Sequence, residues 1–476
     1  MSHVERTAIR ELLTRRDVFR GLHTGLVGIA LGSLLNAASP AAAPRYDVLP
    51  KQPHFAPRAR RVILLFQNGG PSQMDLFDPK PELRKRDGQK PGDGFINTVD
   101  IKKTGTWMGS PFAFARHGAS GIELSELVPG LARHADDITV IRSMVSEHSN
   151  HEQAIWYFNT GLTTPGRPAM GSWVTYGLGT ENQSLPAFAA IMHPKGPPVD
   201  GTRNFSSGWM PPVYQGMAMR AEGTPVLNLK PAGPAGAADA RLQLLQQMNR
   251  EHFSSRTDQL ELEARIASYE LAARMQIAAS EALDLAREPQ SMHDLYGTSD
   301  PEAGIHARQL LLARRLVERG VRFVQVLLNG QPWDTHQKNE SGNREIARRT
   351  DGPAAALLTD LKQRGLFDDT LVIWGGEFGR TVYSQGELSA ENYGRDHHPR
   401  CFSMWLAGGG IKGGTTYGET DEFSYNVVAD PVDVHDLHAT SLHLLGVDHT
   451  RLTFKFQGRH YRLTDVHGRV VRGLLS

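Results

Sequence analysis

Four short apolar runs along the chain each end in a polar segment, which is the pattern of buried strands that open into loops. The runs, each with the segment after it, are Arg61–Phe66 before Gly69-Gly70-Pro71, Asp137–Ile141 before Ser146–His151, Val321–Leu328 before Trp333–His336, and Thr370–Trp374 before Gly376–Arg380. Amphipathic stretches with helical spacing precede two of them, at Ala307–Arg319 and Pro353–Arg364. Alternating strands and helices predict a parallel sheet, whose ligand site lies beyond the carboxyl ends of the strands. We therefore expect the polar side chains to meet at one edge of the sheet.

A charged segment at residues 237–286 interrupts this alternation. It is rich in Ala, Leu, Gln and Glu and lacks Gly and Pro, which predicts one or two inserted helices. These helices are either a solvated packing hairpin or a cap over the site. The preceding residues 193–236 are dense in Gly and Pro and predict a long surface loop. The predicted insertion thus covers about residues 193–290.

The N-terminal segment has the pattern of an export signal. Arg15 and Arg16 form a twin-arginine pair, and residues 21–44 contain no Asp, Glu, Lys or Arg. The uncharged run is rich in Gly, Ser and Ala, whereas a transmembrane anchor needs about 20 strongly apolar residues. We therefore expect export by the twin-arginine route to the periplasm or cell envelope, with no integral membrane span in the mature chain. The predicted organisation is a signal peptide at 1–43, a linker at 44–60 and one domain at 61–476.

Composition narrows the classes of function. The 476 residues include 52 basic and 51 acidic side chains, for a formal charge of +1, so no basic excess favours nucleic acid as a partner. The single cysteine, Cys401, excludes a disulfide framework, cysteine zinc fingers and iron–sulfur ligation. Any metal must therefore be held by histidines and carboxylates.

Polar motifs after the strands offer such ligands. Asp334 and His336 stand two positions apart, close enough to reach one divalent cation from a loop. The segment Asp396–Pro399 adds His397 and His398, and it is equally typical of a surface loop and of a metal site.

Three more carboxylates have two possible roles each. Glu377 stands between glycines and an arginine at a strand end, where a buried carboxylate needs a cation, and that cation is either Arg380 or a metal. Asp75 and Asp78 either supply further oxygen ligands or cap a turn, and Asp75 is the stronger candidate because it is nearer to the strand end.

Several separated motifs resemble the exported "domain of unknown function 1501" family, a branch of the alkaline phosphatase and sulfatase superfamily. They are GGPSQMDLFDPKP at 69–81, WDTH at 333–336, GGEFGRT at 375–381, GRDHHP at 394–399 and LAGGGIKGGTTYGETDEF at 406–423. The motifs cover nearly all of the predicted mature chain in order. The resemblance implies an α/β fold of the alkaline phosphatase type, a sandwich with a central, mostly parallel sheet flanked by helices, to which the helical insertion is added.

The superfamily holds two metal ions, and the resemblance implies which residues stand at their ligand positions. Asp334 and His336 are similar to an Asp with a nearby His, and His397 or His398 to a later His. Glu377 is similar to the acid of an Asp–His dipeptide, although Phe378 stands where the His would be. The first strand ends in Asn68 rather than Asp, unless Asp75 substitutes. One complete divalent metal site and a possible second are therefore implied, with zinc or manganese favoured over calcium. The implied metal ligands are Asp75, Asp334, His336, Glu377, His397 and His398.

The segment Ser146–His151, with Asn159-Thr160-Gly161 after it, is similar to the nucleophile segment of phosphodiesterases in this superfamily. Aligning Asn150 and His151 puts Glu147 at the nucleophile position, so a covalent mechanism needs a displaced hydroxyl, or a metal-bound water replaces it. The candidate hydroxyls are Ser72, Ser146 and Ser149. Cys401 lacks the frame required for formylglycine chemistry. The implied catalytic residues are Ser149, Asn150, His151 and Arg380.

Two functions stay open from the sequence. The first is an exported, metal-dependent hydrolase of phosphate or sulfate esters, with a small-molecule or glycan ester as substrate. The second is a metal- or anion-binding protein of the cell envelope on a degenerate hydrolase scaffold, because a fold does not fix a function.

Overall fold

The computed structural model describes residues 46–92, 94–95, 104–223, 237–254, 266, 270, 281–386, 389 and 393–476. The predicted signal peptide at 1–43 lies outside these residues, and so does part of the predicted insertion.

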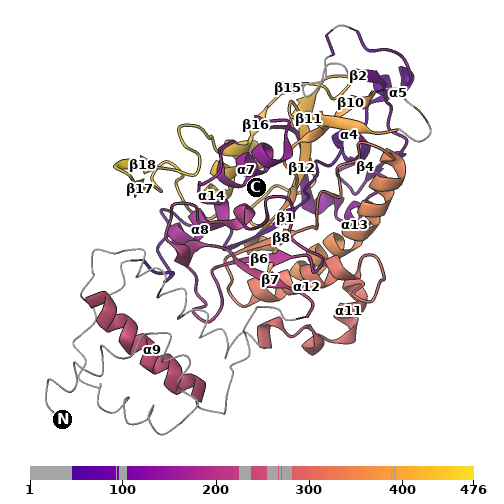
Figure 1. Cartoon of the computed structure of the whole chain (residues 1–476). Helices are drawn as coiled ribbons and strands as arrows, with labels where there is room; N and C mark the ends of the chain where they lie inside the picture. The colour runs from indigo at the N-terminus through magenta and orange to yellow at the C-terminus, as the bar shows by residue number, and fades with distance from the viewer. Residues whose placement is uncertain are drawn as a thin grey trace, which may run out of the picture.

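A central sheet organises the fold (Figure 1). Its strands are β1 (Arg61–Phe66), β5 (Ile138–Val145), β6 (Phe188–Met192), β7 (Met217–Arg220), β8 (Phe323–Leu327), β9 (Thr370–Gly375), β12 (Phe402–Ala407), β13 (Thr415–Tyr417) and β16 (Val432–Asp433). They follow the order β13-β5-β12-β9-β1-β8-β6-β7, and β16 also pairs with β5. Only β12 is antiparallel to its neighbours, β5 and β9, within these pairings. The predicted mostly parallel sheet is therefore confirmed.

Helices cover both faces of the sheet. The central strand β1 therefore carries apolar side chains on both of its sides. Ile63 and Leu65 pack into one hydrophobic cluster, and Leu64 and Phe66 pack into a second. The first cluster contains residues of α12 (Gly304–Glu318) and α13 (Asn339–Gln363), and the second contains residues of α7 (His151–Thr160), α8 (Met170–Leu178) and α14 (Val434–Leu444). This alternation of side chains along a strand produces the sandwich predicted from the sequence.

A smaller antiparallel sheet lies beyond the ends of β9 and β1. It has the order β11-β10-β2, formed by β11 (Arg395–His398), β10 (Gly379–Gln385) and β2 (Thr104–Trp107). The surface-loop alternative for residues 396–399 is wrong over most of its length, since β11 is a strand whose residues are all buried. Its polar side chains are buried with partners contributed by distant segments, and a sequence pattern does not show such partners.

The predicted insertion is partly sheet and partly helix. Within the predicted loop at 193–236, β7 pairs in parallel with β6 and extends the central sheet, so that stretch is part of the sheet domain. The helix α9 covers Ala237–Ser254, where a helix was expected. None of the helices in the described ranges combines the length and the apolarity needed to cross a membrane.

The other elements are short. They are α4 (Gln73–Leu76), α5 (Pro81–Lys85), α6 (Pro129–Ala132), α11 (Gln290–Tyr296), β3 (Phe114–His117), β4 (Ile122–Ser125), β14 (Glu419–Thr420), β15 (Val427–Ala429), β17 (Phe454–Phe456), β18 (Arg459–Tyr461), and the 3-10 turns η2 (Ala135–Asp137), η3 (Gly201–Phe205), η4 (Pro212–Tyr214), η5 (Leu285–Arg287), η6 (Phe367–Asp369) and η7 (Arg472–Leu474).

Candidate active site

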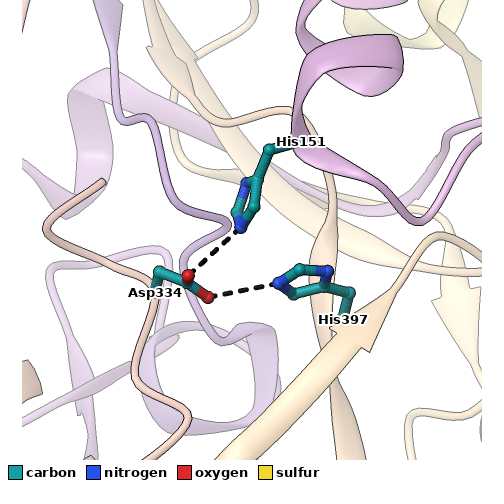
Figure 2. Close-up of side chains that lie close together, drawn as sticks. All are labelled: His151, Asp334 and His397. Carbon is teal, nitrogen blue, oxygen red and sulfur yellow. Dashed lines mark hydrogen bonds and ion pairs between the residues drawn. The ribbon is translucent and has the colours of Figure 1, made fainter. Parts of the chain in front are cut away.

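Asp334 is the centre of a group of polar side chains that lies where several strands end. It follows β8 along the chain, and His151 begins α7 after β5. Arg380 comes from β10 and His397 from β11. Figure 2 shows the imidazoles of His151 and His397 pointing at the two oxygens of the Asp334 carboxylate. Segments that follow β5 and β8 thus meet residues of β10 and β11 at one place.

The Asp334 carboxylate has four close neighbours. Its Oδ1 lies 2.6 Å from Arg380 Nη2, 3.0 Å from His336 Nε2 and 3.2 Å from His397 Nε2. Its Oδ2 lies 3.3 Å from His151 Nε2. Asp396 adjoins this group, with its Oδ1 3.8 Å from His336 Nδ1. We call His151, Asp334, His336, Asp396 and His397 the Asp334 cluster.

The hydrogen bonds made by Nδ1 of His151 and of His397 determine whether Nε2, the nitrogen that faces Asp334, carries a proton in a neutral ring. Nδ1 of His397 lies 2.7 Å from the carbonyl oxygen of Ser149, and Nδ1 of His151 lies 2.7 Å from Oε1 of Glu377. A carbonyl and a carboxylate only accept, so each Nδ1 must carry the proton. In a neutral ring the Nε2 atom then presents a lone pair. Two imidazole lone pairs therefore face one carboxylate, an arrangement that requires a cation between them.

The electrostatics limit which groups can supply this cation. Burial by itself would raise the pKa of Asp334, but the charge of Arg380 and the contacts with the three imidazoles hold it far below its usual value. Burial lowers the pKa of His397 to about 4, so that ring is neutral at neutral pH. Burial also opposes the charged form of His151, yet its bonds with Asp334 and Glu377 outweigh burial and raise its pKa. The cation at His151 is therefore either a proton on its own Nε2 or a metal ion.

Unpartnered nitrogens show that the cluster has unused ligand capacity. Among the described residues, the buried atoms His151 Nε2 and His336 Nδ1 have no hydrogen-bond partner. Ligand atoms of His151, Asp334 and His397 lie within 4.8 Å of one another, and so do those of His336, Asp396 and His397. Nitrogen and carboxylate oxygen ligands suit zinc or manganese. The residues present thus fit the metal site that the sequence resemblance implies.

Glu377 contacts the Nδ1 atom of His151, on the side of the ring that faces away from Asp334. Its side chain is completely buried, and its carboxylate accepts the backbone N–H of Gly69 at 2.9 and 3.3 Å in addition to the bond from His151. Its expected role as a direct metal ligand does not match this position. A carboxylate that holds the remote nitrogen of a histidine fixes the orientation of the ring and makes it a better ligand.

The sequence left open whether Arg380 or a metal ion neutralises Glu377, and the structure shows that Arg380 pairs with a different carboxylate. The buried guanidinium pairs with Asp334, whereas the ion pair considered from the sequence was with Glu377. Its Nε donates to the carbonyl of Gly70 at 2.9 Å, Nη2 to the carbonyl of Gly69, and Nη1 to the carbonyl of Arg395 at 3.3 Å. These bonds make Arg380 a fixed positive charge on one side of the Asp334 carboxylate.

His398 and Asp75 do not join the cluster. In β11, neighbouring side chains point to opposite faces, and His398 turns away from Asp334 to donate from Nε2 to the carbonyl of Tyr425 at 2.7 Å. Asp75 accepts from Arg395 Nε at 2.9 Å and Nη2 at 3.1 Å, so its charge is neutralised inside the protein. The possible second metal site therefore lacks the oxygen ligand expected from Asp75.

Besides His151, the segment predicted to carry the nucleophile meets the cluster through the backbone of Ser149. Ser149 contributes its carbonyl oxygen to His397, and Asn150 is the N-cap of α7 without a side-chain cap hydrogen bond. Ser72 donates to Asp75 at 2.7 Å, so that hydroxyl is directed away from Asp334. The catalytic roles of Ser149 and Asn150 stay predictions.

Sequence reasoning missed Asp396 as a candidate ligand and gave His151 a catalytic role only. The motif GRDHHP at 394–399 places the carboxylate of Asp396 directly before His397, and this neighbourhood could have indicated Asp396 as a ligand. The ligand capacity of His151 depends on Glu377, and a sequence motif does not show that contact.

Comparisons with known proteins give a family and several solved structures to which the chain is similar. A family model described as "Protein of unknown function (DUF1501)" matches residues 59–475, and no curated protein matches. Among solved structures, the chain is similar to the lipoteichoic acid synthase LtaP from Listeria monocytogenes, with 10% identity, a TM-score of 0.35, and coverage of 88% of this chain and 78% of that chain. It is also similar to the PsFucS1 sulfatase from Pseudoalteromonas sp., with 13% identity, a TM-score of 0.34, and coverage of 82% and 68%. A protein in the alkaline phosphatase superfamily from Vibrio parahaemolyticus has 11% identity, a TM-score of 0.34, and coverage of 91% and 78%.

Proposed function

Since the chain belongs to the DUF1501 family, whose description assigns no activity, we propose a function from the site itself: an exported, metal-dependent hydrolase of phosphate or sulfate esters. The observation that carries the proposal is the pair of Nε2 atoms, on His151 and His397, that face the Asp334 carboxylate at 3.3 and 3.2 Å.

The charges of the site support a divalent ion. Asp334, Glu377 and Asp396 are buried or partly buried carboxylates, and Arg380, which pairs with Asp334, is the cation among the contacts described above. With neutral imidazoles, these four groups leave an excess of two negative charges. A buried excess of this kind is costly unless a cation compensates it. A divalent metal would provide the missing charge without requiring protonated rings.

The protein residues have distinct tasks in this proposal. His151, Asp334 and His397 would hold the metal, while His336 and Asp396 offer further ligand atoms at its side. When bound, the metal would polarise the ester and lower the pKa of a water molecule. Glu377 keeps the proton of His151 on Nδ1, and Arg380 stabilises negative charge beside Asp334.

His336 suits contact with a substrate. Its side chain is 31% exposed, whereas those of His151 and His397 are 9% and 10% exposed. Its Nδ1 has no hydrogen-bond partner among the described residues. An imidazole at the open side of the site can hold the leaving oxygen or deliver a proton to it.

The twin-arginine pair Arg15-Arg16 supports export, so we place the protein in the periplasm or cell envelope. A small-molecule or glycan ester is the substrate class within this proposal. The second candidate function is metal or anion binding without turnover. It is favoured by the position of Ser149, which meets the cluster through its carbonyl rather than its hydroxyl.

Metal analysis combined with a turnover screen tests the proposal. The purified exported protein is assayed on aryl phosphate, phosphodiester and sulfate esters, beside Asp334→Asn and the control Asp368→Asn, which changes an exposed carboxylate on η6. We expect bound zinc or manganese and ester turnover in the parent and the control, and loss of both in Asp334→Asn. Metal binding without turnover of any ester favours the second candidate. A parent that binds no divalent metal contradicts the hydrolase proposal and leaves of the second candidate only anion binding.

A further inference from the structure

A pocket separate from the Asp334 cluster lies at the other end of α7. It has a volume of about 510 Å³ and is lined by Trp156, Thr160, Arg167, Arg203, Ser206 and Trp209, among others. The helix begins at His151, and a rise of about 1.5 Å per residue places Trp156 about 8 Å further along the axis. The pocket shares no lining residue with the cluster, and the proposed function does not use it.

Trp209 is a fixed aromatic wall of this pocket. Its ring stacks on Phe456 of β17 with centroids 5.3 Å apart and an interplanar angle of 11°. It also meets Trp173 of α8 edge to face, at 5.9 Å and 89°. Both contacts hold the indole in one orientation, and the side chain stays partly exposed. Trp156, also partly exposed, supplies a second indole from α7.

Arg167 brings a rigid and incompletely bonded guanidinium to the same pocket. Its Nη2 lies 3.1 Å from Asp465 Oδ2, and its guanidinium carbon lies 5.1 Å from the centre of the Tyr461 ring. Its buried Nη1 has no hydrogen-bond partner among the described residues. A buried donor without a partner is costly unless a water or a ligand satisfies it. A water or a ligand group that reached Nη1 would satisfy this donor.

Arg203 adds a second and more exposed cation. Its side chain is 62% exposed and lies 3.3 Å from Asp200 Oδ1. The described residues that line the pocket include Arg167 and Arg203 and no carboxylate, because the paired Asp465 and Asp200 lie outside the lining. A ligand in the pocket would therefore meet the two guanidiniums before their carboxylate partners.

Two indoles, two guanidiniums and a serine hydroxyl match the surface of an acidic sugar. A pyranose ring has flat faces of C–H groups that stack on indole and an edge of hydroxyl groups that accept N–H donors. A uronate or sulfate group on the ring would meet the arginines. A free phosphate ion would use the arginines and leave both indoles without a contact. We propose that this pocket binds one acidic pyranose residue of a saccharide chain.

Binding measurements on the full exported protein test this site without any need for turnover. The probe is a heparin-derived tetrasaccharide, with uncharged maltotetraose as the matched control, and tryptophan fluorescence and titration calorimetry report binding. Trp156→Ala removes one indole. Arg203→Gln removes a charge from an exposed side chain, and its matched control is Arg60→Gln, because Arg60 is 64% exposed and lies 3.9 Å from Asp369.

We expect the acidic tetrasaccharide to bind more tightly than maltotetraose. Trp156→Ala should weaken it by about tenfold and Arg203→Gln by about three- to tenfold. Arg60→Gln and Asp334→Asn should leave it unchanged. The proposal is overturned if the tetrasaccharide does not bind, if Arg203→Gln and Arg60→Gln bind it equally, or if Asp334→Asn abolishes binding, which would locate the saccharide at the Asp334 cluster. A heparin fragment carries sulfate esters and is therefore also a candidate substrate of the proposed hydrolase. Binding that persists in Asp334→Asn, where turnover is expected to be lost, separates this pocket from the Asp334 cluster.

Discussion

Glu377 accepts a hydrogen bond from Nδ1 of His151 at 2.7 Å, and this bond turns Nε2 of the same ring toward Asp334, 3.3 Å away. The backbone N–H of Gly69 holds the carboxylate from the other side. The buried Glu377, which lies outside the Asp334 cluster, therefore determines which nitrogen of His151 can bind a metal ion.

Replacing Glu377 by Gln should weaken metal binding although no ligand atom is removed. The amide oxygen can still accept from Gly69, but the amide N–H₂ then competes for Nδ1 of His151 and favours the proton on Nε2. Loss of such a supporting carboxylate costs about 10- to 100-fold in metal affinity. Titration calorimetry of the stripped protein with Zn²⁺ measures this change. Equal affinity in the variant and the parent would show that Glu377 does not control the ring.

The neighbouring histidines of β11 provide a matched pair. His397→Ala should abolish tight metal binding, because Nε2 of His397 faces Asp334. His398→Gln should keep it, because a glutamine N–H can replace the bond from Nε2 to the Tyr425 carbonyl. The second variant should lower the free energy of unfolding by about 1 kcal/mol at most. Calorimetry and urea unfolding on both variants check this, and loss of metal binding in His398→Gln would contradict the assignment.

These two histidines show how far the sequence predicts the site. The ends of parallel strands meet at one edge, so the convergence of His151 with Asp334 and His336 could be predicted from apolar runs. Which member of the pair faces Asp334 depends on the register of β11 against β10, where Arg380 pairs with His397.

The unpredicted parts of the site depend on buried polar partners. β11 consists of Arg, Asp, His and His, so it lacks the apolar alternation that indicates a strand. Its Arg395 is buried because Asp75, far away in the sequence, neutralises it. A sequence pattern does not show such a pair, and the same contact removes Asp75 from the candidate metal ligands.

Stability should fall in mild acid because of His438, a buried histidine of α14 far from the cluster in sequence. Burial lowers its pKa to about 4 from an ordinary 6.5, so between these values the unfolded chain binds more protons than the folded one. Its contribution is thus complete above pH 6.5 and is lost as the pH falls toward 4. Each pKa unit corresponds to about 1.4 kcal/mol, which sets an upper bound of about 3 kcal/mol for this residue.

Urea unfolding at pH 7 and at pH 4.5 measures that slope. His438→Gln can keep the hydrogen bond from Nε2 to the Phe158 carbonyl and removes the titrating group. The difference in unfolding free energy between the two pH values should therefore be smaller in the variant. An unchanged difference would mean that other groups account for the acid sensitivity.

Export is expected to depend on the arginine pair. Replacing Arg15 and Arg16 together by Lys preserves the charge and removes the twin-arginine pattern. The double variant should stay in the cytoplasm, where cell fractionation detects it, while the parent protein reaches the envelope. Undiminished export of the double variant would rule out the twin-arginine route.

Anomalous diffraction at the zinc absorption edge, from crystals of the full exported protein equilibrated with Zn²⁺, tests the central claim most directly. We predict a peak within ligand distance of Nε2 of His151, Nε2 of His397 and the Asp334 carboxylate, with Glu377 still bonded to Nδ1 of His151. A crystal in which Zn²⁺ occupies other sites while these three side chains keep their mutual contacts would contradict the account.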